Sequence, residues 1–375
     1  MDNHEAQCRT VLYDLHIALD AKMTSFGGFL MPLHYQGILK EHRAVRDAAG
    51  VFDTCHMGEF RIGGPKAVAD LENLLSSSVA TMAIGQCRYG FICNEQGGTI
   101  DDQVLYRLAE EEFMMVVNAS TRKRDFDWLK AHVSEGTTTE DISERTAKID
   151  LQGPSSPVIM AKLTDESIED MKFYRWRRSH FRDRPILMSR TGYTGEVGFE
   201  IYCDNDLAPA IWNECIKGGA TPAGLGARDT LRLEMGMPLY GHELNANRNP
   251  AETGFGRAIS TDKRFIGSEK ILAPTHRPEL LVGIALNGKR SARSGDVVND
   301  KTGIKIGTVT SGSFSPSLER GIALAYVDKG RAAIGTLVNI DNGRRELPGS
   351  VVELPFYKFA TGRKPMKELL NKNGI

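Results

Sequence analysis

Residues 94–108 read NEQGGTIDDQVLYRL, and the two adjacent acids in this stretch constrain how the surrounding chain can fold. Asp is depleted from strands, yet the residues that follow Asp102 read as one. On an extended chain successive side chains point to opposite faces of the sheet, so Asp101 and Asp102 should diverge. One carboxylate can then meet solvent. The other looks inward and needs a partner, because burying an unpaired charge is costly.

The segments around these acids predict a sheet with a covering helix. Cys87–Cys93 and Gln103–Leu108 read as paired strands, and the glycines at 97–98 are typical of the turn between them. FMMVVN at 113–118 reads as a buried strand, and the residues after Thr121, RKRDFDWLKAHV, as a helix.

Two further helices and one boundary are predicted in the first half of the chain. Residues 37–50 have helical spacing, with Gly50 as a suitable C-cap, and a second helix is expected over 66–75. The polar, Thr-rich segment 136–144 predicts a domain boundary.

The second half of the chain first repeats this mixture of strands and helices and then becomes dense in strands and turns. KIDLQGP at 148–154 reads as a strand into a turn, 155–163 as a helix and 227–235 as another helix. Residues 289–355 are dense in strands and turns, which predicts a separate small β-barrel. Because strands and helices do not alternate regularly, the sequence favours an α+β fold over a doubly wound sheet.

Charge and composition exclude several classes of partner. The 375-residue chain has 47 basic and 48 acidic residues, a net charge of −1, which gives no electrostatic reason to expect nucleic acid or a membrane surface as partner. No window approaches 18 apolar residues, and the N-terminus lacks the pattern of a signal peptide.

The six cysteines predict a reducing compartment. They are scattered along the chain, form no CxxC and have no zinc spacing with histidine, so no metal site is expected. We therefore expect a cytoplasmic protein.

Several polar residues are candidates for a small-molecule pocket, and each has a plainer alternative. Tyr193 and Glu200 lie among glycines that permit close ligand approach, but hairpin geometry alone would also explain those glycines. Arg228 could bind a carboxylate through two hydrogen bonds or pair with a surface acid. His56 and Met57 could line a pocket, although a lone histidine is more often structural.

Taken in order, the motifs of the chain resemble the glycine cleavage system T-protein, the aminomethyltransferase family. The resemblance runs nearly end to end, and no single motif decides it. The segments that carry it include HYQGILKEHRAVRDAAGVFDTCHMGE (34–59), RYGFICNEQGGTIDD (88–102), SRTGYTGEVGFEIY (189–202), GLGARDTLRLEMGMPLYG (224–241) and IGTVTSGSFSPSLERGIALAYV (306–327).

The resemblance implies three domains in a cloverleaf around a central channel that holds tetrahydrofolate. Carried onto this chain, residues 1–50 and 145–245 would form a discontinuous first domain that binds folate. Residues 51–144 and 246–276 would form a second α+β domain, and 277–375 the C-terminal β-barrel.

The resemblance also implies roles for single residues. Asp102 matches the catalytic carboxylate that projects into the channel, orients the folate and assists proton transfer, while Asp101 would be its outward or structural neighbour. Glu200 matches the carboxylate that binds the amino edge of the pterin. The pocket walls are matched by Tyr193, Tyr89 and Met57, and the arginine of the folate site by Arg228.

In the family reaction, the lipoylated H-protein delivers an aminomethyl group, ammonia is released and methylenetetrahydrofolate forms. No metal is required. A folate-binding protein without transferase activity is a second possibility, but the lysine–glycine–cysteine–tyrosine motif typical of that branch is absent, and the intact Asp102 also speaks against it.

Three positions depart from the family pattern and keep another reaction open. Arg257 stands where a tryptophan is usual, Val197 where Asp is usual, and Leu281 where some members have a basic residue. Arg257 could suit an anionic donor or simply point to solvent. A folate-dependent methyltransferase or demethylase, acting on a small-molecule methyl donor in place of the H-protein, therefore remains an alternative.

Overall fold

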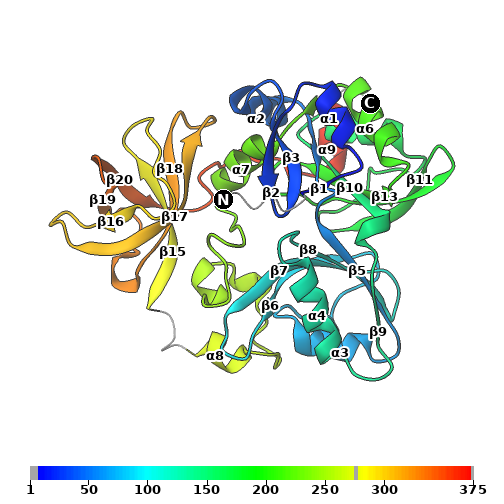
Figure 1. Ribbon diagram of the computed structural model, residues 1–375, viewed down its shortest axis with the longest axis horizontal. Helices are drawn as coiled ribbons and strands as arrows, with labels where there is room; N and C mark the ends of the chain where they lie inside the picture. Colours follow the sequence, from blue (N-terminus) through cyan, green and yellow to red (C-terminus); the bar gives the residue numbers. More distant parts are fainter. Residues whose placement is uncertain (1–6, 274–277, 373–375) are drawn as a thin grey trace.

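Three β-sheet units make up most of the molecule (Figure 1). The computed structural model describes residues 7–273 and 278–372. Within them lie a six-stranded sheet, a five-stranded sheet and a closed six-stranded barrel, with a small three-stranded sheet near the N-terminus. Helices accompany mainly antiparallel sheets, and the last unit is a barrel, so the predicted α+β class is confirmed.

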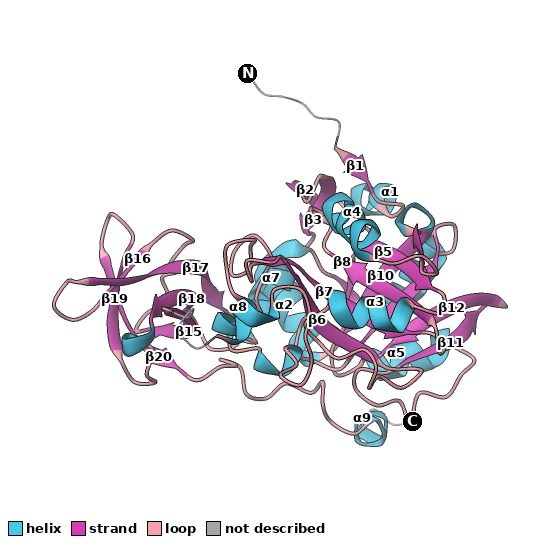
Figure 2. Ribbon diagram, turned by 90° about the horizontal axis from the view of Figure 1, so that it is seen from below, coloured by secondary structure: helices cyan, strands magenta, loops and turns pink. Residues whose placement is uncertain are grey.

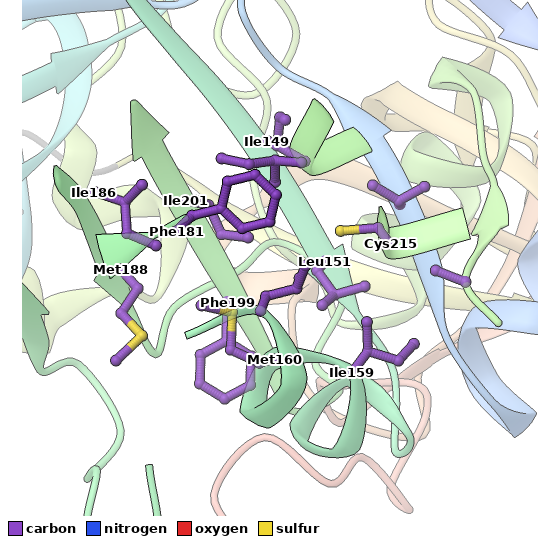
Figure 3. Close-up of a cluster of buried hydrophobic side chains, with 14 of the residues drawn as sticks. Ile149, Leu151, Ile159, Met160, Phe181, Ile186, Met188, Phe199, Ile201 and Cys215 are labelled. Carbon is purple, nitrogen blue, oxygen red and sulfur yellow. The ribbon is translucent and has the colours of Figure 1, made fainter. Parts of the chain in front are cut away.

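The six-stranded sheet carries the largest apolar core. Its order is β11-β12-β13-β10-β4-β14, antiparallel except between β14 and β4. Side chains such as Leu151 and Phe199 pack against helices α5 and α6 (Figure 3). The elements are β4 (Gly50–Asp53), β10 (Thr146–Gln152), α5 (Ser156–Leu163), β11 (Trp176–Phe181), β12 (Arg184–Ser189), β13 (Gly198–Asp204), α6 (Ala208–Lys217) and β14 (Thr221–Pro222).

One predicted cap is wrong. The helix expected over 37–50 is α2 (Ile38–Asp47), whose C-cap residue is Ala48, and Gly50 instead begins β4 opposite Gln152. A Cβ at Gly50 would collide with the side chain of Val45, so the glycine is needed for close packing between the helix and the strand that follows it.

The five-stranded sheet contains the predicted hairpin. Its order is β6-β7-β8-β5-β9, and all neighbours are antiparallel. β7 begins at Thr99, earlier than predicted, so Asp101 and Asp102 lie inside the strand. The elements are β5 (Gly58–Gly63), α3 (Ala67–Leu74), β6 (Cys87–Cys93), β7 (Thr99–Arg107), β8 (Glu112–Val117), α4 (Arg122–His132) and β9 (Thr138–Asp141).

The polar segment 136–144 is only in part a boundary. It contains β9, the edge strand of this sheet, which pairs with β5. The chain passes to the six-stranded sheet at β10, after this segment has ended.

The barrel lies at one end of the molecule (Figure 2). It begins with β15, before the strand-dense segment 289–355, and apolar side chains such as Ile284, Val309 and Ile340 fill its interior. Its strands are β15 (Glu279–Leu286), β16 (Val297–Asn299), β17 (Lys305–Ser315), β18 (Arg320–Asp328), β19 (Leu337–Asp341) and β20 (Glu346–Val352).

Helix α7 (Leu225–Glu234) lies where these parts meet, in contact with α2, with β3 and with barrel strands β17 and β18. The small N-terminal sheet, in the order β1-β3-β2, completes this region. The remaining elements are β1 (Cys8–Arg9), α1 (Tyr13–Ala18), β2 (Lys22–Phe26), β3 (Phe29–His34), the short helices at Pro250–Thr253 and Gly256–Ala258, and α8 (Ser268–Leu272).

A buried carboxylate at the end of α7 joins the barrel to the helices. Glu234 accepts hydrogen bonds from Arg46 Nη2 (2.9 Å) on α2 and from Ser315 Oγ (2.6 Å) and the Ser317 backbone N–H (3.0 Å) on the barrel side. Burial alone would raise the pKa of Glu234, but the hydrogen bonds and charges of His42 and Arg46 lower it to about 2.

This depressed pKa makes stability depend on pH. Because the folded-state pKa is lower than the ordinary 4.5, the carboxylate stabilises the fold above pH 4.5, and this stabilisation of about 3 kcal/mol is lost as the pH falls towards 2. We expect Glu234→Gln to lower the free energy of unfolding by about 2–3 kcal/mol at pH 7 and by much less at pH 3. Urea unfolding at both pH values measures this.

A matched control is Glu353→Gln, which removes an exposed acid that pairs with Lys358. This exposed pair should contribute nothing measurable at either pH. An equal loss of stability for Glu234→Gln at pH 7 and pH 3 would contradict the assigned pKa.

After β20 the chain returns to the six-stranded sheet, and we call residues 353–372 the C-terminal strap. The Tyr357 backbone N–H donates to the carbonyl of Glu234, and that of Gly362 to Gly195, both at 2.9 Å. The strap ends in α9 (Met366–Lys372; Figure 1). This helix packs beside α5 and adds Met366, Leu369 and Leu370 to the largest core.

We propose the domain division predicted from the sequence, with one adjustment. The pairing of β4 with β10 groups residues 50–53 with the first domain, although the predicted boundary lies after residue 50. Within residues 7–273 and 278–372, no helix has the length and apolar composition needed to cross a bilayer.

Candidate active site

A cavity of about 940 Å³ lies where the three units meet. This volume suits a small organic molecule. The five-stranded sheet contributes Tyr89, Asp102, Val104 and Val116, the first predicted domain and the turn beside it contribute Met57, Tyr193, Glu200 and Arg228, and the barrel contributes Arg293, Ser313 and Phe314. All six residues predicted for the site therefore line one cavity.

Asp102 lies half-buried in the cavity wall and is held from two sides. Tyr89 Oη donates to Oδ2 (3.0 Å) from the neighbouring strand β6, and Asn118 Nδ2 donates to Oδ1 (2.9 Å) from the end of β8. Both carboxylate oxygens are thus fixed in direction, while each keeps a lone pair for a ligand.

Asp101 points to the other face of β7 and is completely buried. It accepts hydrogen bonds from the Asn118 backbone N–H (3.0 Å), from Asn118 Nδ2 (2.8 Å) and from Thr121 Oγ1 (2.8 Å). The expectation that the outward acid meets solvent is wrong, because Asn118, Thr121 and the start of α4 cover the side chain of Asp101. Asp101 is a structural neighbour that positions Asn118.

The surroundings of Asp102 suit it for proton transfer near neutral pH. Burial and the neighbouring Asp101 raise the pKa of Asp102 to about 7, although the hydrogen bonds from Tyr89 and Asn118 lower it. Burial and Asp125 raise the pKa of Asp101 well above its usual range. A group whose pKa lies close to the working pH can both accept and release a proton.

Glu200 forms a second polar centre in the cavity wall. Its Oε1 accepts from Lys148 Nζ (2.7 Å) and its Oε2 from Tyr106 Oη (3.0 Å). Thr191 Oγ1 also donates to Oε2. These donors fix a carboxylate that can accept hydrogen bonds from the amino edge of a ring.

A line of alternating charges connects Glu200 to Arg228. Lys148 Nζ also donates to Asp150 Oδ1 (2.6 Å), and Arg228 Nη1 donates to Asp150 Oδ2 (2.8 Å). The guanidinium carbon of Arg228 lies 5.0 Å from the ring centre of Tyr193. Arg228 is thus held by a buried acid, which excludes its alternative role in a surface pair.

The sequence interpretation missed Asn118, Lys148 and Asp150. The signal for the last two was present in KIDLQ, where polar residues alternate with Ile149 and Leu151. That alternation indicates a strand with one apolar and one polar face. Asn118 left no comparable signal, because its role depends on the register of β8 against β7.

None of the three departures from the family pattern lies among the cavity-lining residues of the described chain. Arg257 is exposed, Val197 is buried in the core of the six-stranded sheet, and Leu281 is buried against the outside of the barrel near α7. The structure therefore favours the solvent-facing alternative for Arg257.

Known families match almost the whole chain. Residues 12–263 match the GCVT N-terminal domain, and residues 280–358 match the Glycine cleavage T-protein C-terminal barrel domain. The chain belongs to the glycine cleavage T-protein family. This confirms the resemblance predicted from its motifs.

Individual members of the T-protein family support this assignment. An aminomethyltransferase of Saccharopolyspora erythraea is 42% identical over 359 residues, covering 93% of this chain and 98% of the relative. One of Thermotoga maritima is 40% identical over 362 residues, covering 95% and 99%. The crystal structure of glycine cleavage system aminomethyltransferase T from Bartonella henselae superposes with a TM-score of 0.89 at 32% identity, covering 95% and 99%. The chain is thus a transferase enzyme, of a family that is generally folate-dependent.

Proposed function

We propose that this enzyme is the tetrahydrofolate-dependent aminomethyltransferase of glycine cleavage. It would release ammonia from the aminomethyl-dihydrolipoyl H-protein and form methylenetetrahydrofolate. The observation that carries the proposal is the placement of Asp102, a carboxyl with a near-neutral pKa held in the cavity wall by two donors. The proposal includes a cytoplasmic location, supported by six free cysteines.

The cavity residues fit a folate. Glu200 offers a fixed acceptor for the amino edge of a pterin, and the aromatic side chains of Tyr89 and Tyr193 offer walls for its ring. Arg228 keeps donors for a carboxylate beyond the one that it gives to Asp150. Tetrahydrofolate would supply the nitrogen nucleophile that takes up the one-carbon unit.

The residues of the chain would then orient and exchange protons. Asp102 would take a proton at one carboxylate oxygen, and the hydrogen bonds from Tyr89 to Oδ2 and from Asn118 to Oδ1 would keep the carboxylate oriented in the cavity wall. Because the reaction needs alignment more than a covalent enzyme intermediate, positioning and charge placement should supply most of the acceleration.

The test is a transfer assay with purified protein and tetrahydrofolate. One arm supplies aminomethyl-loaded H-protein, and the other a panel of small methyl donors. We expect ammonia and methylenetetrahydrofolate to form in the H-protein arm and not with the small methyl donors. Methyltetrahydrofolate from a small donor, with the H-protein inert, would support the methyltransferase alternative, although Arg257, Val197 and Leu281 lie outside the cavity and do not favour it.

A further inference from the structure

His56 lies in the cavity wall at the crossing between two sheets. It belongs to the turn 54–57, closed by a hydrogen bond from the Met57 backbone N–H to the Thr54 carbonyl (3.2 Å). This turn connects β4 of the six-stranded sheet to β5 of the five-stranded sheet. His56 is therefore held by rigid elements on both sides.

The imidazole of His56 is buried without polar partners. The residue is only 5% exposed, and Phe26 and Phe29 pack against the ring, with ring centres 5.6 and 6.3 Å away. Nδ1 is fully covered and has no hydrogen-bond partner, and no hydrogen bond to Nε2 is found, in the part of the chain that the structure describes. An unsatisfied buried polar group is costly, so the ring needs a partner from outside the protein.

The charge state of His56 limits what that partner can be. Burial, together with the positive charges of Arg228 and Lys148, lowers the pKa of His56 to about 4, while Asp53 and Asp150 oppose the shift. The ring is therefore neutral at pH 7 and carries one proton. A covered nitrogen without a partner is tolerated better as an acceptor than as an N–H, so the proton belongs on Nε2.

We propose that His56 is a further ligand-binding residue, whose Nε2–H donates to an uncharged acceptor of the bound folate, such as a ring carbonyl or an amide oxygen. This inference rests on the proposed function and extends it. Arg228 also lines this cavity, and its positive charge suits a carboxylate of the ligand. The neutral N–H donor of His56 suits an uncharged oxygen instead.

The proposal makes opposite predictions for stability and for binding. Phe in place of His56 keeps a ring against Phe26 and Phe29 but removes both nitrogens. Without ligand, His56→Phe should melt at the same temperature as the wild type or higher, because an unsatisfied buried group has been removed. With ligand, the lost hydrogen bond should appear as weaker binding.

The experiment titrates the full chain with 5-formyltetrahydrofolate, a stable folate, by calorimetry and follows melting without it. We expect His56→Phe to bind about tenfold more weakly and His56→Gln, which keeps an N–H donor, to bind within about threefold of wild type. His180→Phe, which changes an exposed histidine on β11, is the matched control and should bind as wild type does.

Other results would overturn the inference. Equal affinity for His56→Phe and wild type would show that the ring makes no polar contact with the ligand. Weaker binding accompanied by a clearly lower melting temperature would make its role one of packing. If the wild type binds no folate at all, the proposed function itself fails, and the role of His56 fails with it.

Discussion

Replacement of Asp102 by Asn is expected to lower turnover by about 10²–10⁴-fold, the usual contribution of a positioned acid or base. The amide has the shape of the carboxylate, so the cavity should keep its form, but it cannot accept the proton. Folate affinity should stay within a few fold of the wild-type value. The measurements are turnover with loaded H-protein and calorimetric binding of folate.

The pH dependence of turnover gives an independent check on Asp102. Because its pKa is raised to about 7, the wild-type rate should change with an apparent pKa close to that value. The control is Asp127→Asn, which removes an exposed acid on α4 that pairs with Lys123 and should leave turnover unchanged. Unchanged turnover in Asp102→Asn would remove the catalytic assignment.

Lys148→Met should be the most destabilising of the substitutions considered. The lysine is buried and lies 2.6 Å from Asp150 and 2.7 Å from Glu200. Its removal takes the shared cation from Glu200 and from Asp150, which keeps its pair with Arg228. Breaking a buried pair in this way typically costs about 3–5 kcal/mol. Urea unfolding at pH 7 measures the loss.

Two further variants show whether the unpaired charge is the cause. Adding Glu200→Gln to Lys148→Met removes the acid that has lost its cation and should restore part of the lost stability. Lys162→Met, an exposed position on α5, should have no measurable effect. If the double variant is no more stable than Lys148→Met, loss of packing rather than charge explains the effect.

Local patterns predict the elements better than they predict burial, although the strand expected over 103–108 begins at Thr99 and so includes the two acids. The hairpin of β6 and β7 follows from glycine and strand signals that lie close together in the sequence. The burial of Asp101 does not follow from such local signals, because this burial depends on how β8 and the start of α4 pack on β7. A sheet with one open face would expose one acid to solvent, but here Asp101 is fully buried and Asp102 borders the cavity.

Local sequence patterns also do not predict the line of charges that runs from Glu200 to Arg228. Lys148 and Glu200 lie on neighbouring strands, but 52 positions apart in the chain, so their pairing becomes visible only with the register of β10 against β13. Arg257 illustrates the opposite case. The motif leaves open whether this residue meets a donor or solvent, and in the structure it is exposed and is not among the cavity-lining residues.

The C-terminal strap has a consequence for synthesis on the ribosome. Met366, Leu369 and Leu370 complete a core that already includes Leu12, so the first domain cannot be finished until residues 366–370 have emerged. Its early strands must wait in an incomplete state while the five-stranded sheet and the barrel form, exposing apolar surface that invites aggregation. Truncation of the chain before Met366 would therefore damage the part of the protein that was made first.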